Sequence, residues 1–259
     1  MSGDITDMFR LHGRTALVTG ASSGLGRHFA LTLVRAGARV VVAARRRDKL
    51  AELVAEIGAC GGEAQAVELD VASSESVRAG FEAIEKRLGV VDLIVNNAGV
   101  RVDKALLEQS EADWDFVLDT NLKGTWLVAQ EGARRMVAAG RGGSIVNIAS
   151  ILGARVAGGV APYAISKAAL VQATRAMALE LARHDIRVNA ILPGYIATDF
   201  NREWIASEAS ERVRSRIPTR RFGKPEDLDG ALLLLASAAG AHITGAALAV
   251  DGGHLLKFI

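Results

Sequence analysis

The hydrophobic residues of this chain gather in seven short runs, separated by longer stretches of mixed hydrophobic and charged residues. The runs are rich in Val, Ile, Leu and Ala and occupy residues 15–20, 38–44, 64–71, 91–99, 143–150, 186–194 and 246–253. Such continuous apolar runs are typical of parallel strands that helices cover on both faces. The stretches between them predict helices over about 27–36, 48–60, 111–139 and 162–183, and a further helix capped by Ser73 or Ser74. Ser110 is the expected N-cap of the helix over 111–139. Alternating strands and helices indicate a doubly wound α/β fold with one sheet of seven parallel strands.

Residues 230–250 are apolar over a length that could cross a membrane. However, Gly240, His242, Thr244 and Gly245 interrupt this stretch. Because such residues weaken a membrane-spanning helix, we expect a short buried helix, a turn and a buried strand here.

Composition excludes several classes of protein. Hydrophobic residues make up 50% of the 259 residues and charged residues 23%, and no linker or repeat divides the chain. A net charge of +2 gives no strong field that would attract nucleic acid or an anionic membrane. The one cysteine, Cys60, fits a reducing, cytoplasmic location, and the amino terminus lacks a signal-peptide pattern. The five histidines show no metal-ligand spacing, so no catalytic metal is expected.

Unusual residues follow six of the seven predicted strands. In chain order they are TGASSGLG (19–26), the arginines 45–47, Asp70, NNAG (96–99), Ser150 and PGYIATD (193–199). Because the carboxyl ends of parallel strands share one edge, where ligands of open α/β sheets bind, these residues predict one binding site.

The glycine-rich segment indicates nucleotide binding. Gly20, Gly24 and Gly26 follow a strand and precede a helix, where glycine lets the backbone approach a pyrophosphate and the helix amides face the anion. Their spacing, G-x3-G-x-G, differs from the commoner G-x-G-x-x-G, and an ordinary tight turn is the alternative. NNAG is either a plain turn or a loop that passes close to the same nucleotide.

The arginines after the second strand favour NADP(H) over NAD(H). An acidic residue at this point would bind a ribose 2′-hydroxyl, whereas an arginine accommodates a 2′-phosphate. This chain has Ala44 followed by Arg45, Arg46 and Arg47. We expect Arg45 to be the main phosphate contact, with Arg46 beside it, and interpret Arg47 as a solvated helix start.

Tyr163 and Lys167 stand four residues apart in a predicted helix and therefore share a face. A phenol with its ordinary pKa near 10 exchanges protons poorly at neutral pH, and a nearby ammonium lowers that pKa. The pair thus predicts a general acid–base tyrosine, although a helix-start aromatic with a solvated neighbour is the alternative. Asn121 lies inside a predicted helix, where asparagine is unfavourable, and so indicates a local disruption with a purpose.

Together, TGASSGLG, NNAG, Asn121, Ser150, the Y-x-x-x-K of Tyr163 and Lys167, and the PG at Pro193 resemble the short-chain dehydrogenase/reductase family. The resemblance runs from about residue 12 to Gly253, and the chain is similar to 3-oxoacyl-[acyl-carrier-protein] reductases. It implies one Rossmann-type domain over 1–259. Within it, a cofactor half would span about 12–150, a catalytic and substrate half about 151–259, and a lid about 195–221.

The resemblance also implies the role of each site residue. Ser150 would bind the substrate carbonyl, Tyr163 would exchange the proton, Lys167 would bind the nicotinamide ribose and lower the pKa of the phenol, and Asn121 would place a water beside Lys167. The cofactor-binding residues would be Gly20, Ser22, Ser23, Gly24, Leu25, Gly26, Arg45, Arg46, Asp70, Val71, Asn97, Ala98, Gly99, Tyr163, Lys167, Pro193, Gly194, Ile196 and Thr198.

The expected activity is NADP(H)-dependent interconversion of a ketone or aldehyde and an alcohol on a small molecule, with an acyl thioester among the candidates. The alternatives are a sugar, polyol or cyclic alcohol dehydrogenase that uses NAD(H), and a low-turnover redox sensor. Six arginines between Arg202 and Arg221 indicate a solvated face, or attraction to an acidic carrier protein or a carboxylated substrate. The resemblance implies a homotetramer or homodimer, and the apolar tail HLLKFI fits burial in such an assembly.

Overall fold

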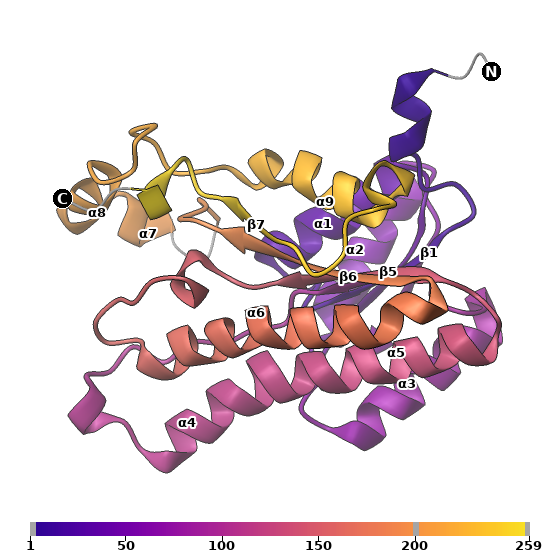
Figure 1. Cartoon of the computed structure of the whole chain (residues 1–259), viewed down its shortest axis with the longest axis horizontal. Coiled ribbons are helices and arrows are strands. Elements are labelled where there is room, and N and C mark those ends of the chain that lie inside the picture. Colours follow the sequence, from indigo (N-terminus) through magenta and orange to yellow (C-terminus); the bar gives the residue numbers. More distant parts are fainter. Residues whose placement is uncertain (1–3, 199–201, 257–259) are drawn as a thin grey trace.

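A sheet of seven parallel strands in the order β3-β2-β1-β4-β5-β6-β7 forms the centre of the molecule (Figure 1). The computed structural model describes residues 4–198 and 202–256. The strands are β1 Thr15–Thr19, β2 Arg39–Ala44, β3 Ala64–Glu68, β4 Leu93–Asn96, β5 Gly143–Ile148, β6 Ile186–Pro193 and β7 Ala247–Val250. The helices are α1 Gly24–Arg35, α2 Arg47–Ala59, α3 Ser74–Leu88, α4 Glu111–Leu118, α5 Thr125–Ala138, α6 Ala161–Leu181, α7 Arg202–Ile205, α8 Glu208–Arg214 and α9 Asp229–Ala236. The doubly wound parallel sheet predicted from the apolar runs is confirmed.

Helices cover both faces of this sheet, with α1, α2 and α9 on one side and α3, α5 and α6 on the other (Figure 1). Phe29 of α1, Leu50 of α2 and Leu232 of α9 pack in one apolar cluster against the strands. Phe81 of α3 and Met136 of α5 belong to a second cluster on the opposite face. Burial of apolar surface on both faces, the main driving force of folding, explains the unbroken apolar runs of the central strands.

The two edge strands depart from full burial. In β3, buried and exposed residues alternate, and β7 is exposed along most of its length, with Leu248 36% accessible. The prediction of a buried strand at the end of 230–250 is therefore wrong for the single chain, because β7 is an edge strand with a neighbour on one side only. The predicted short buried helix is confirmed as α9, and no described helix is both long enough and apolar enough to span a bilayer.

The predicted helix over 111–139 contains an irregular middle. Its start is as predicted: Ser110 Oγ accepts from the amide of Asp113, whose carboxylate accepts from the amide of Ser110. Between α4 and α5 lies a π-helical segment, η3 (Asp119–Gly124), which carries the fully buried Asn121. The local disruption predicted at this asparagine is confirmed, and π-helical turns inside α-helices are frequent at functional sites.

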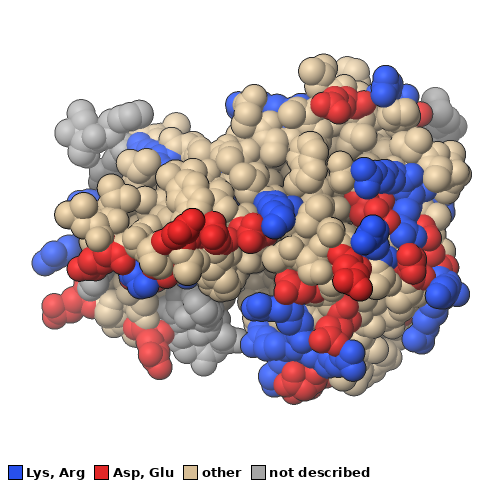
Figure 2. Space-filling model, turned by 90° about the horizontal axis from the view of Figure 1, so that it is seen from below, with Lys and Arg blue, Asp and Glu red and all other residues tan. Residues whose placement is uncertain are grey.

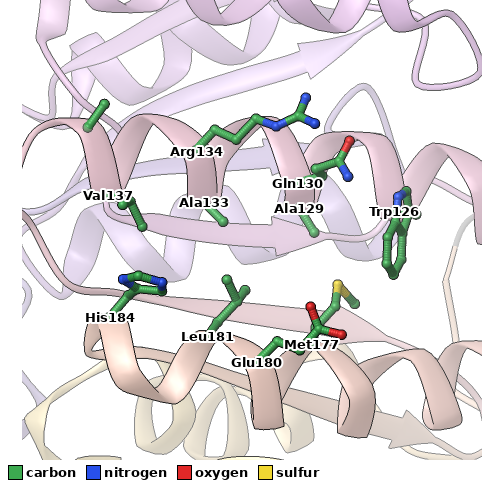
Figure 3. A pocket seen from close by; sticks show the side chains of 11 residues that line it. Trp126, Ala129, Gln130, Ala133, Arg134, Val137, Met177, Glu180, Leu181 and His184 are labelled. Carbon is green, nitrogen blue, oxygen red and sulfur yellow. The ribbon is translucent and has the colours of Figure 1, made fainter.

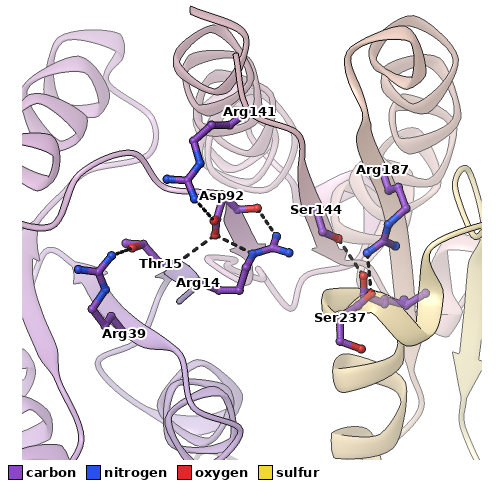
Figure 4. Close-up of polar contacts among 9 residues, drawn as sticks. Arg14, Thr15, Arg39, Asp92, Arg141, Ser144, Arg187 and Ser237 are labelled. Atoms are coloured by element: carbon purple, nitrogen blue, oxygen red, sulfur yellow. Dashed lines mark hydrogen bonds and ion pairs between the residues drawn. The ribbon is translucent and has the colours of Figure 1, made fainter. Parts of the chain in front are cut away.

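Arginines contact polar groups at the amino ends of the strands (Figure 4). The glycine-rich loop follows the carboxyl end of β1 and so lies at the opposite edge. Asp92, only 3% exposed, forms ion pairs with Arg14 and Arg141 and accepts from the amide of Thr15. Farther along this edge, Arg187 donates to the carbonyl of Ser237. These contacts fix the relative positions of the strands from the side that faces away from the predicted site.

Candidate active site

Three of the predicted catalytic side chains meet at the carboxyl end of β5. Ser150 lies two residues beyond this strand and lowers the pKa of the Tyr163 phenol, near the start of α6. Lys167 stands one turn farther along α6, with Nζ 5.6 Å from the centre of the Tyr163 ring. The same ammonium donates to the carbonyl of Ile148, at 2.8 Å, so it is anchored to the end of β5.

Local sequence explains why this helix starts here and lies so close to the strand. Pro162 occupies the first turn of α6, a position that tolerates proline because its missing amide would have no partner there. The turn after Ser150, η4 (Ile151–Gly153), packs directly on α6. A Cβ on Gly153 would lie 2.8 Å from the carbonyl oxygen of Lys167, so only glycine permits this approach.

Burial sets the protonation behaviour of the pair. Lys167 is 4% exposed, and burial lowers the pKa of its amine to about 8. Tyr163 keeps part of its surface accessible, yet its hydroxyl is surrounded by protein atoms. Burial raises the pKa of this phenol above its ordinary value, outweighing the Ser150 hydrogen bond and the charge of Arg101, which both lower it.

The expected lowering of the phenol pKa by Lys167 stays a prediction, because the pKa of Tyr163 is raised on balance. The physical reason is that desolvation acts on both partners: it favours the neutral phenol and the neutral amine together. An amine that readily loses its proton offers a phenolate less stabilisation than a permanent charge would.

Asn121 joins the π segment to two other parts of the site. Its Oδ1 accepts from the amide of Val100, at 2.7 Å, and its Nδ2 donates to the carbonyl of Val100, at 2.9 Å. The same Nδ2 donates to Ser166 Oγ, at 3.1 Å, and Ser166 donates to the carbonyl of Tyr163, at 2.7 Å. The side chain thus clamps the loop after β4 to the helix that carries Tyr163, while its expected role in placing a water stays a prediction.

Sequence reasoning missed Ser166. This serine is fully buried, and it connects Asn121 to the backbone of Tyr163. A hydroxyl inside an apolar helix, directly before Lys167, is the signal that points to it. Thr19 was missed as well: at the end of β1, its Oγ1 accepts from the amides of Asn97 and Ala98, each at 3.1 Å.

The glycine-rich loop and the NNAG loop pack against each other and fit a dinucleotide. Gly20 has φ +66°, and a Cβ there would lie 2.8 Å from Ala98 Cα, so the two backbones touch. Gly24 has φ +54°, and no atom lies within 4 Å of the place its Cβ would take. Ser23 makes no capping hydrogen bond to α1, so an anion can approach the first amides of this helix over open backbone.

The arginines at the end of β2 lie as follows. Arg46 donates to Ser22 Oγ and to Ser23 Oγ, each at 2.8 Å, and so reaches over the glycine-rich loop. Arg45 and Arg47 are both exposed, and Arg47 forms an ion pair with Glu68. The structure brings Arg46 to the loop, and the expected leading role of Arg45 stays a prediction.

The remaining predicted residues line the same edge. Asp70 follows β3 and accepts from the amide of Ala72, while Val71 packs against Gly124 of the π segment. Gly99 stands beside the amine of Lys167, because its Cβ would lie 3.6 Å from Lys167 Nζ. Pro193 ends β6, followed by Gly194, Ile196 and Thr198. Leu25 and Gly26 belong to the first turn of α1.

The expected lid over 195–221 contains α7 and α8; residues 199–201 lie outside the described part. Tyr195 stacks on Trp204 of α7, with ring centres 5.5 Å apart, and also contacts Phe222 and His254. Tyr195 therefore packs in an aromatic cluster that joins the lid to Phe222 and His254.

Comparison with known proteins identifies the family. The family model described as enoyl-(acyl carrier protein) reductase matches residues 20–254. The chain belongs to the short-chain dehydrogenase/reductase family. It is an oxidoreductase, and the resemblance drawn from its motifs is confirmed.

Individual relatives carry different names. The chain is 38% identical over 247 residues to a 3-oxoacyl-[acyl-carrier-protein] reductase of Thermotoga maritima, covering 95% of this chain and all of the relative. It is 38% identical over 248 residues to a gluconate 5-dehydrogenase of Gluconobacter oxydans, covering 95% and 96% of the two chains. A gluconate 5-dehydrogenase of Burkholderia cenocepacia, solved with NADP and tartrate, superposes with a TM-score of 0.94 at 38% identity, covering 99% of this chain and 100% of the other.

Burial of Lys167 predicts that the free energy of unfolding rises with pH above about 8. The unfolded chain holds the lysine proton up to its ordinary pKa of 10.5, whereas the folded chain releases it from about 8, so the unfolded state binds more protons in between. The rise is at most about 3 kcal/mol, since one pKa unit corresponds to about 1.4 kcal/mol. Urea unfolding at several pH values between 7 and 10 should show this rise for the wild type and not for Lys167→Met; equal pH dependence in both proteins contradicts the assignment.

Proposed function

We propose that this protein interconverts a ketone or aldehyde and the corresponding alcohol with NADP(H), and that Tyr163 is the general acid and base. The observation that carries the proposal is the meeting of Ser150, Tyr163 and Lys167 at the carboxyl edge of the sheet, beside Gly99 and Asn121. A redox sensor with little turnover would have no use for a hydroxyl pair and a buried amine in this arrangement. The cytoplasmic location expected from the single cysteine stays a prediction.

In the proposed mechanism a dinucleotide held by the glycine-rich loop, Arg46 and Lys167 would supply the hydride for reduction of the carbonyl, or take it up in oxidation of the alcohol. The Ser150 hydroxyl binds the substrate oxygen, and Tyr163 gives its proton to that oxygen during reduction or takes it during oxidation. Because its pKa is raised, the phenol is protonated at neutral pH, which is the form that reduction requires. Lys167 supplies positive charge when the phenolate forms, so the amine holds its proton most firmly at the moment when it is needed.

The choice of NADP(H) rests on the basic end of β2 and on the loop it faces. Arg46 joins the hydroxyls of Ser22 and Ser23, and Arg45 stands next to it, so two guanidinium groups and two hydroxyls are available to one phosphate. Guanidinium groups bind phosphate through paired, charge-assisted hydrogen bonds. Relatives solved with NADP include the Burkholderia cenocepacia enzyme, which supports the same choice.

The names of the relatives point to two classes of substrate, acyl thioesters and sugar acids. Attraction of an acidic carrier protein would need free arginines on the lid. However, Arg214 pairs with Glu211, Arg221 pairs with Asp227, and Arg220 donates to the carbonyl of Ser215. These contacts place a carboxylate or a carbonyl beside three of the six lid arginines and favour the solvated-face interpretation for those three. We propose a small carbonyl or alcohol compound as substrate.

Replacement of the catalytic phenol tests the reaction. Tyr163→Phe should lower turnover by about 100-fold or more, because general acid–base catalysis is typically worth 10²–10⁴-fold. The matched control is Tyr195→Phe, which removes the hydroxyl of the only other tyrosine in the sequence. NADPH oxidation should be followed with a panel of ketones, aldehydes and acetoacetyl thioesters, and NADPH binding should be retained in both variants. Turnover of Tyr163→Phe within a few-fold of the wild type refutes the proton-transfer role.

Substitution of the arginines tests the cofactor. Arg46→Gln should raise the Kd for NADP+ by about tenfold or more, since hydrogen bonds to charged groups contribute about 1.5–3 kcal/mol. The Kd for NAD+ should change little, and Arg45→Gln, at the contact expected from the sequence, should also raise the Kd for NADP+. Arg47→Gln, which removes a charge already paired with Glu68, is the control. Tighter binding of NAD+ than of NADP+ by the wild type contradicts the proposed cofactor.

We also propose that a second copy of the chain covers the groove between α5 and α6. This groove, of about 380 Å³, is lined by Trp126 and Val137 from α5 and by Met177 and Leu181 from α6 (Figure 3). Trp126 and Val137 are 42% and 40% exposed, and exposed apolar patches of this kind mark interaction sites. The face viewed from below in Figure 2 mixes basic and acidic side chains, without a region of one sign that spans it.

Charge complementarity favours a copy of the same chain as the occupant. Arg134 stands on the α5 side of the groove and Glu180 on the α6 side. If a two-fold axis runs along the groove, Arg134 of each copy would face Glu180 of the other. Val137→Asp should therefore reduce the molar mass measured by sedimentation velocity. Val156→Asp, the same change at a residue that is 88% exposed outside the groove, should leave it unchanged. A wild type that sediments as a monomer at micromolar concentration excludes this interface.

A further inference from the structure

Arg101 lies on a loop that is fixed at both ends beside the catalytic residues. Val100, the residue before it, is held by two hydrogen bonds to the side chain of Asn121. Farther along, the amide of Lys104 donates to the carbonyl of Gly159, at 2.9 Å, which joins the loop to the segment between Ser150 and α6. The loop is therefore bonded to two segments that adjoin the helix carrying Tyr163, and Arg101 lies in its fixed part.

The charge of Arg101 acts on the catalytic centre. It lowers the pKa of Tyr163, which means that the guanidinium lies within electrostatic reach of the phenol. The other cation of the centre, Lys167, is buried and anchored to the carbonyl of Ile148. Arg101 differs because its side chain is 49% exposed, so it can meet a molecule that arrives from solvent.

The contact that Arg101 makes within the chain can be exchanged. Its Nε and Nη2 donate to one carboxylate oxygen of Asp103, at 3.2 and 3.0 Å, only two residues away. The side chain of Asp103 is 63% exposed, and ion pairs with this exposure contribute little to stability. A carboxylate on a bound substrate could therefore replace Asp103 at small cost, and the planar guanidinium is suited to bind it through two hydrogen bonds.

We propose that Arg101 binds a carboxylate group of the substrate, so that the enzyme acts on hydroxy acids and oxo acids in preference to neutral alcohols and ketones. This inference rests on the proposed function, since it concerns the substrate of the same site. Asp103 occupies the guanidinium until the substrate carboxylate displaces it. Arg101 is then the residue that decides between a sugar acid and a neutral acyl group.

The test compares a charged and a neutral substrate within each variant. With NADP+, kcat/KM is measured for gluconate and for sorbitol, a neutral polyol of the same chain length. In the reverse direction, NADPH oxidation is measured with the neutral N-acetylcysteamine thioester of acetoacetate. Because the loss of Arg101 also changes the field at Tyr163, the ratio of kcat/KM for gluconate to that for sorbitol is the readout. An effect on the phenol enters both terms of this ratio and cancels.

Three variants carry the comparison. Arg101→Gln should lower the ratio by about tenfold or more, through KM for gluconate, because a charge-assisted hydrogen bond is lost. Asp103→Asn removes the competing carboxylate and should raise the ratio severalfold. Lys104→Gln is the matched control: it removes a cation from the same loop, but one that pairs with Asp113. The ratio for this control should stay at the wild-type value.

A binding measurement makes the test independent of which acid is oxidised. Tartrate should inhibit reduction of the neutral thioester competitively, and its inhibition constant should rise about tenfold in Arg101→Gln and stay unchanged in Lys104→Gln. If the wild type reduces the thioester while tartrate binds the wild type and Arg101→Gln equally well, the inference is overturned and the proposed function stands. If NADPH binds but none of the substrates reacts, the proposed function fails and the inference fails with it.

Discussion

The site depends on one amine that the fold takes out of water. Lys167 is 4% exposed, and its ammonium is held by the carbonyl of Ile148. Removing a cation from solvent is costly, and this cost lowers the pKa of the amine to about 8. A charge kept in such a place is weakly screened by water, so it can act strongly on groups beside it. Its neighbours here are the Tyr163 ring, Gly99 and the clamp formed by Asn121.

The surrounding fold holds this amine and its partners in place from three directions. β5 supplies Ser150 and the carbonyl of Ile148, α6 supplies Tyr163 and Lys167, and the π segment supplies Asn121. Asn121 connects the loop after β4 to α6 through Val100 and Ser166, so the position of Arg101 is coupled to that of Tyr163. At the opposite edge, the arginines around Asp92 fix the strands that carry these groups. The parallel sheet thus holds the proposed reacting groups at one edge, and the loops at that edge can vary to suit different substrates.

The sequence predicts most of the fold because its signals are local. Apolar runs identify the central strands, the Ser110–Asp113 spacing identifies a helix start, and the i, i+4 spacing of Tyr163 and Lys167 places both on one face. What it could not predict depends on contacts between distant segments. The exposure of β7 follows from its place at the edge of the sheet, and the raised pKa of Tyr163 follows from the density of protein around its hydroxyl. Asn121 positions Ser166 by a direct hydrogen bond and Arg101 through its neighbour Val100. In the chain, Asn121 lies 45 residues from Ser166 and 20 from Arg101.

The most direct measurement is a crystal structure of the complex with NADP+ and an unreactive hydroxy-acid analogue. The account predicts that the hydroxyls of Ser150 and Tyr163 both hydrogen-bond the analogue's reacting oxygen, and that the amine of Lys167 lies against the nicotinamide ribose. A complex in which the Tyr163 hydroxyl points away from that oxygen, with the Lys167 amine apart from the ribose, would contradict the central claim.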